Sequence, residues 1–142
     1  MTIKAAGNAI INDLVESGSF LRRQVSMNDY GVLDNTSGCA IVLQPGNSTF
    51  EVIAYGGVTR DLWGLVAECY VRDTGIVTET LTRTWDIIDA VMGAVSGGSN
   101  GNSGDMTSKV STITKPRDTF VEFGGNDFIP IYVTIVVQED PC

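Results

Sequence analysis

The chain has 142 residues, of which 43% are hydrophobic, and a net charge of −8, which fits one globular domain of ordinary composition. It lacks a run of about 18 apolar residues and the basic and apolar regions of a secretory signal, so we expect a soluble, intracellularly made protein with no membrane partner. The acidic balance argues against tight binding of nucleic acid, and the absence of histidine excludes every His-dependent catalytic triad.

The first predicted element is a helix over residues 2–17. Its apolar residues recur at steps of three and four and form one stripe: Ile3, Ala6, Ile10 and Leu14, widened by Ile11 and Val15. Polar residues, Asp13 among them, lie largely off this stripe, and Gly18 is typical of a helix end. The pattern from residue 20 to 38 is poor, and we expect a flexible loop over residues 28–38.

Three strands are predicted next, over residues 39–44, 50–55 and 62–72, and together they suggest an antiparallel meander. Alternation places one set of side chains of the third strand on a common face: Trp63, Leu65, Ala67, Cys69 and Val71. Cys39 and Cys69 lie within apolar runs and are interpreted as buried free thiols, because the three cysteines, with Cys142, lack the spacing of metal ligands.

A second helix is predicted to begin near Thr78, with threonine as its cap and Glu79 in its first turn. Its apolar stripe has the clearest helical spacing in the chain and is expected to face the sheet: Leu81, Trp85, Ile88, Met92 and Val95. Both tryptophans, Trp63 and Trp85, are therefore assigned to the core. Asp86 and Asp89 fall on the opposite, solvated face.

A Gly/Ser/Asn-rich segment follows, and we expect a second flexible loop over residues 96–108. It has no lysine and follows a helix, so it does not match a phosphate-binding loop. A strand over residues 110–114 and a closing β-hairpin come next, with strands over 119–123 and 129–137 around the predicted turn Gly124-Gly125-Asn126-Asp127. One face of the last strand is aliphatic, whereas the other is mixed: Pro130, Tyr132, Thr134, Val136 and Gln138.

These elements predict a single α+β domain over residues 1–142, in the order α-β-β-β-α-β-β-β. A mainly antiparallel sheet is packed on one face by two helices. No arrangement of nucleophile and base and no metal or cofactor motif is found, so we expect a protein that is not an enzyme and that uses no cofactor.

The whole layout resembles the tail terminator, or tail completion, proteins of long-tailed bacteriophages, including the lambda-like terminator. Three parts carry the resemblance: the N-terminal helix Ile3–Val15, the strand Asp61–Val71, and the segment Thr112–Phe123 together with the strand Ile131–Val137. The resemblance implies a virion protein, assembled in the bacterial cytoplasm, that forms a homohexameric ring. Such a ring caps the tail tube, stops its polymerisation and offers a surface to the head-neck or stopper protein, while DNA crosses the lumen.

Two sets of residues are candidate subunit contacts. Basic residues are scarce on this acidic chain, which favours Arg22, Arg23, Arg60 and Arg117. The mixed face of the last strand suits a neighbouring subunit, which adds Tyr132, Thr134 and Val136. The alternatives are another neck, head-completion or tube-related ring protein and, in a different class, a small α+β ligand-binding domain.

Overall fold

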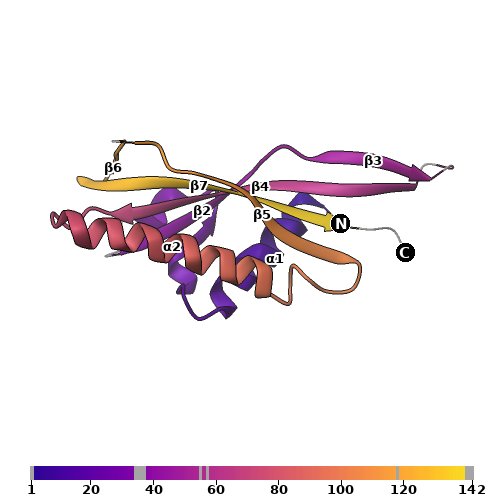
Figure 1. The fold of residues 1–142 in the computed structure, drawn as a ribbon, viewed down its shortest axis with the longest axis horizontal. Coiled ribbons are helices and arrows are strands. Elements are labelled where there is room, and N and C mark those ends of the chain that lie inside the picture. The colour runs from indigo at the N-terminus through magenta and orange to yellow at the C-terminus, as the bar shows by residue number, and fades with distance from the viewer. Residues whose placement is uncertain (1, 34–37, 55, 57, 118, 140–142) are drawn as a thin grey trace.

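A computed structural model describes residues 2–33, 38–54, 56, 58–117 and 119–139. In chain order the elements are α1 (Ile3–Glu16), the 3-10 helix η1 (Arg22–Gln24), β1 (Val25–Met27), the 3-10 helix η2 (Tyr30–Leu33), β2 (Cys39–Pro45), β3 (Thr49–Ala54), β4 (Val58–Arg72), α2 (Val77–Gly97), β5 (Met106–Thr114), β6 (Val121–Phe123) and β7 (Asn126–Glu139). Figure 1 shows their arrangement along the elongated molecule.

The described strands form one seven-stranded sheet in the order β1-β2-β4-β7-β5, with β3 added to β4 and β6 added to β7. β1 pairs in parallel with β2, and the other pairs are antiparallel. The α+β class is confirmed. The predicted order is wrong in one respect, because β1 was not expected; three residues are too few to show a strand period.

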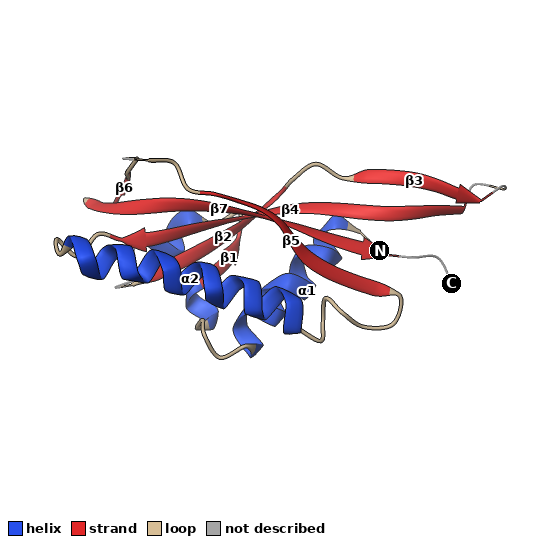
Figure 2. Ribbon diagram, in the orientation of Figure 1, coloured by secondary structure: helices blue, strands red, loops and turns tan. Residues whose placement is uncertain are grey.

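Both α-helices lie on the same side of the sheet (Figure 2). The alternation of the central strands explains why: their odd-numbered side chains enter the core beneath the helices, among them Ile41, Leu65, Cys69, Ile131 and Ile135. The odd-numbered residues of the closing strand from Ile129 to Val137 therefore face the helices, as predicted, and Cys39 and Cys69 lie on the same side and form no disulfide. Burial raises the pKa of both thiols, which keeps them protonated.

A smaller cluster lies on the opposite face at one end of the sheet, where Leu33, Ala40, Val42, Tyr70 and Phe128 are buried. It is covered by η2 and β6, which means that part of the predicted flexible loop 28–38 is a packed 3-10 helix. Residues 34–37 of that loop lie outside the described residues.

Tyr30 of η2 fixes this cover to the sheet. Its hydroxyl donates to Oε2 of Glu68 on β4 at 2.6 Å and its ring meets that of Tyr70 edge to face, with centroids 6.3 Å apart. The hydrogen bond to the Glu68 carboxylate raises the pKa of Tyr30.

The closing hairpin is confirmed, with a shorter turn than expected. Phe123 pairs with Asn126, so Gly124 and Gly125 alone make the turn, both with positive φ, at 59° and 81°. A two-residue turn of this kind suits glycine and matches the twist of the strands it joins. Asn126 and Asp127, predicted as turn residues, belong to β7.

Helix α1 matches its predicted stripe, since Ala6, Ile10, Ile11 and Leu14 are buried. Thr2 caps it by accepting a hydrogen bond from the Ala5 N–H at 3.1 Å. One polar residue departs from the prediction: Asp13, expected off the stripe, is 2% exposed.

Asp13 is buried because it holds the loop that follows α2. Its Oδ1 accepts hydrogen bonds from the backbone and side-chain nitrogens of Asn100, both at 2.9 Å, and its Oδ2 accepts from the Gly101 N–H at 2.7 Å. A Cβ added to Gly101 would lie 2.9 Å from Oδ2 of Asp13 and 2.6 Å from Oγ of Ser108, so only glycine allows this approach. The loop 96–108, expected to be flexible, is therefore anchored at these residues.

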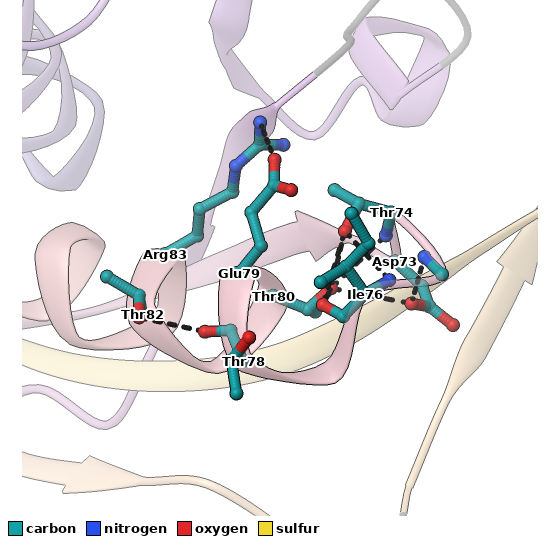
Figure 3. Close-up of polar contacts among 9 residues, drawn as sticks. Asp73, Thr74, Ile76, Thr78, Glu79, Thr80, Thr82 and Arg83 are labelled. Atoms are coloured by element: carbon teal, nitrogen blue, oxygen red, sulfur yellow. Dashed lines mark hydrogen bonds and ion pairs between the residues drawn. The ribbon is translucent and has the colours of Figure 1, made fainter.

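The start of α2 also differs from the prediction (Figure 3). Ile76, not Thr78, is the N-cap residue, and its side chain makes no capping bond. Thr80, one turn into the helix, is 3% exposed; its hydroxyl accepts from the Thr74 N–H at 3.2 Å and lies 3.1 Å from the Ile76 carbonyl oxygen. The Gly75 N–H donates to Oδ1 of Asp73 at 2.9 Å. A buried threonine thus ties the segment before α2 to its first turn, and the expected side-chain cap is absent.

The predicted core stripe of α2 is wrong, because the stripe that is buried lies one residue earlier along the helix. The buried residues are Thr80, Thr84, Ile87, Val91, Ala94 and Val95. Of the predicted stripe, only Val95 is fully buried and Ile88 is half-buried, whereas Leu81, Trp85 and Met92 are exposed. Apart from Ile87, the buried side chains are the small ones of threonine, valine and alanine, which let α2 approach the sheet closely, while Leu81, Trp85 and Met92 are left outside.

Strand β4 is fifteen residues long and extends past the helices at one end. Its residues 65–71 pair with β2 and its residues 58–62 pair with β3, along the same edge. The chain crosses from β2 to β3 beside Gly64, where an added Cβ would lie only 1.9 Å from the Asn47 carbonyl oxygen. We call β3 with residues 58–62 of β4 the arm; it projects beyond α1 and α2 in Figure 1.

Candidate assembly surfaces

The most exposed apolar surface of the described chain lies along α2. Val77, Leu81, Trp85, Ile88 and Met92 follow one another at helical spacing along the flank of the helix, next to its buried stripe, and we call them the α2 ridge. Trp85 is 75% exposed and Val77 is 72% exposed. Large aromatic and aliphatic side chains gathered on one exposed stripe are typical of a surface that another protein covers.

The α2 ridge borders a groove that the segment following β5 closes on the other side. One hollow lies among Val77, Thr80, Leu81, Lys115, Pro116 and Phe120, with Asp73, Thr119 and Ile129. A second lies among Leu81, Thr84, Trp85, Ile88, Asp89 and Lys115. Since both include Leu81 and Lys115, they adjoin one another, and the exposed Phe120 continues the apolar surface beyond the helix.

The arm carries the second exposed apolar surface. Phe50 and Val52, on one face of β3, are 57% and 74% exposed. Phe50 pairs across the arm with Asp61 and packs edge to face on Trp63, with ring centroids 5.3 Å apart. Trp63 points to the helix side of the sheet, as predicted, so Phe50 and Val52 lie on that side too, where the helices do not reach.

The mixed face of β7 lies on the other side of the sheet, as its alternation predicts. Tyr132, Thr134 and Val136 are each half-buried and stand opposite Glu68, Val66 and Gly64 of β4. The three predicted contact residues thus share one strip of the outer face. A partly covered strip of this composition fits a neighbouring subunit as well as it fits a solvated sheet face.

The four predicted arginines lie in three separate parts of the chain. Arg22 and Arg23 are exposed on η1, where Arg22 Nη1 donates to Oδ1 of Asn12 at 3.2 Å. Arg60 is half-buried on the arm, and Arg117 is exposed between β5 and β6. They lie in different parts of the chain, and their role as subunit contacts remains a prediction.

The sequence reasoning missed the α2 ridge and the exposed face of the arm. For the α2 ridge a signal was present: α2 has two adjacent stripes of non-charged residues, and a helix on a sheet buries only one of them. For the arm no signal exists in its own residues, because Phe50 and Val52 alternate like those of any half-buried strand.

The described residues hold no cluster of metal-binding side chains near these surfaces. No group of three or more His, Cys, Asp or Glu side chains in the described chain could hold a metal ion. The hollow between α1 and α2, of about 560 Å³, is lined by acidic and small residues: Asp13, Glu16, Ser17, Ser19, Asp89, Ala90, Gly93, Ala94, Gly97, Gly98 and Ser99. Small-molecule sites instead favour aromatic and aliphatic walls.

Comparison with protein-family models finds no family that matches this chain, and comparison with curated proteins finds no relative. Within the described residues, no helix has the length and apolar character needed to cross a membrane. The fold and its exposed surfaces are therefore the observations on which a function can be argued.

Proposed function

We propose that this chain is a structural protein of a phage tail, similar to the tail terminators, that assembles into a ring of identical subunits, six in the family it resembles. The ring caps the end of the tail tube, stops tube polymerisation and presents a surface to the head-neck protein. It performs no catalysis and uses no cofactor.

The observation that carries this proposal is the exposed α2 ridge. A chain of 15.2 kDa leaves Trp85, Val77 and Leu81 in contact with water, and such an exposed apolar stripe supports a subunit of an assembly over a self-contained monomer. The arm adds an apolar surface at a different place on the same chain. Two different surfaces that meet head to tail generate a ring when the rotation between subunits closes.

The net charge of −8 also supports the proposal. DNA that leaves through a ring must slide past its wall without adhering. A wall of the same sign of charge as DNA favours this, because it offers few cations to replace the counterions of the phosphates.

The proposal is tested by adding the purified protein to tail-tube subunits that polymerise in vitro. Electron micrographs should then show shorter tubes, with a ring at one end of each. Bovine serum albumin at the same concentration controls for crowding. Tubes of unchanged length with bare ends would remove the terminator role, and rings bound to heads or neck complexes but not to tubes would instead place the protein elsewhere in the neck.

A further inference from the structure

On the helix side, the sheet is covered along most of its length by α1 and α2, but the arm is bare. The helices end where the arm begins, as Figure 1 shows, and Phe50 and Val52 are exposed at the place where a helix would continue the layer. A sheet face with apolar side chains needs a covering layer to remove them from water. Nothing in the described part of the same chain supplies one.

Helix α2 presents the complementary feature. One of its stripes packs on the sheet of its own chain, while the α2 ridge remains uncovered. The helix therefore has the shape and the apolar residues needed to cover a second piece of sheet. The arm lacks a helix and α2 lacks a second sheet, and each is the kind of partner that the other requires.

We propose that the α2 ridge of one copy of the chain packs on the arm of the next copy, with Phe50 and Val52 of the arm placed against Trp85 and Leu81. This inference rests on the proposed ring and identifies the contact that forms it. The α2 helix then contacts two pieces of sheet, its own through the buried stripe and the neighbour's arm through the adjacent ridge.

A second copy fits this surface for two further reasons. The contact joins two different places on the chain, so each subunit offers one free ridge and one free arm, and the chain of contacts continues until it closes. In addition, Lys115 borders the ridge beside Leu81 and Trp85, and Asp61 stands across the arm from Phe50. A lysine on one side and an aspartate on the other favour the correct register between two chains that repel each other through their net charge.

Two variants, each of which damages one half of the contact, test the inference by sedimentation velocity. Trp85→Glu places a charge on the ridge and leaves the arm intact. Phe50→Glu places a charge on the arm and leaves the ridge intact. Each variant alone should sediment as a single protomer of 15.2 kDa, whereas the wild type should sediment as the ring. An equimolar mixture should form a species of twice the protomer mass and no larger one, because only one intact ridge and one intact arm remain between the two chains.

The matched controls place the same charge on the same elements. Thr82→Glu lies on α2 beside the ridge, and Thr49→Glu lies on β3 next to Phe50 with its side chain on the other face; both positions are exposed and both variants should still form the ring. A benzoylphenylalanine in place of Val52 gives an independent measurement. Irradiation should link it to a peptide of α2 from another chain.

The outcomes separate this contact from the ring itself. If Trp85→Glu abolishes association while Phe50→Glu does not, two α2 helices meet each other and the inference is wrong. If both variants still form rings, the contact lies elsewhere and the ring proposal stands without it. If the wild type stays monomeric at every concentration and leaves tubes uncapped, both proposals fail.

Discussion

Helices α1 and α2 lie side by side on the same face of the sheet, yet only one of them could be oriented from its own residues. α1 has a single apolar stripe, and that stripe is buried. α2 has two adjacent stripes, and the more hydrophobic of them faces water. The difference teaches that helical periodicity identifies a helix, whereas orientation follows only when one stripe has no competitor. The apolar stripe left over on such a helix is the place where we propose that a partner binds.

The largest difference in the free energy of unfolding is expected when a leucine is replaced by alanine in each of the two helices. Leu14→Ala in α1 removes a side chain that is 0% exposed and should lower the free energy of unfolding by about 2–5 kcal/mol, because it leaves a cavity. Leu81→Ala in α2, at a side chain 42% exposed, should change the protomer stability by about 0.5 kcal/mol or less. Urea unfolding of dilute monomer measures both, and equal losses would mean that α2 faces the sheet through Leu81.

The second prediction concerns the buried carboxylate of α1. Asp13→Ala leaves the N–H groups of Asn100 and Gly101 without their acceptor and should cost about 1–3 kcal/mol of protomer stability. Asp86→Ala, on the exposed side of α2, serves as the control and should be nearly neutral. Amide hydrogen exchange should show faster exchange at residues 100 and 101 in the first variant. Unchanged exchange there would mean that Asp13 does not anchor the loop.

A smaller effect is expected at the start of α2. Thr80→Val keeps the shape of a buried side chain but removes the acceptor of the Thr74 N–H, which should cost about 1 kcal/mol. Thr82→Val, in the same helix, removes a hydroxyl that is exposed and donates to the Thr78 carbonyl at 2.8 Å. Thermal unfolding should show a lower midpoint temperature for Thr80→Val only. The same midpoint for both would show that the Thr80 network does not hold the helix start.

The smallest perturbation uses the two tryptophans as reporters. In Trp63→Phe only the exposed Trp85 emits, and its fluorescence should be strongly quenched by acrylamide at low protein concentration. In Trp85→Phe only Trp63 emits; since its indole nitrogen is buried, quenching should be weak at every concentration. If the α2 ridge is covered on assembly, the quenching of Trp85 should fall as the concentration rises. Quenching that is weak from the start would place Trp85 in the core.

The predicted fold could be largely derived from local pattern. Alternation in residues 62–72 and 129–137 correctly identified the central strands and the side of each that enters the core, because a strand has only two faces and here one is aliphatic. The candidate contacts Tyr132, Thr134 and Val136 follow from the same alternation and share a face. Their role at an interface remains a prediction.

What the sequence determined by itself was the class of the fold, the positions of both α-helices and of the main strands, and the burial of α1. Each of these depends on residues close together in the chain. The tertiary structure decided the rest: the stripe of α2 that faces the sheet, the burial of Asp13 against Gly101, the parallel pairing of β1 and the bare face of the arm. These depend on what lies opposite a residue in space, and close packing of α2 on the sheet buries mostly small side chains and leaves Leu81, Trp85 and Met92 exposed.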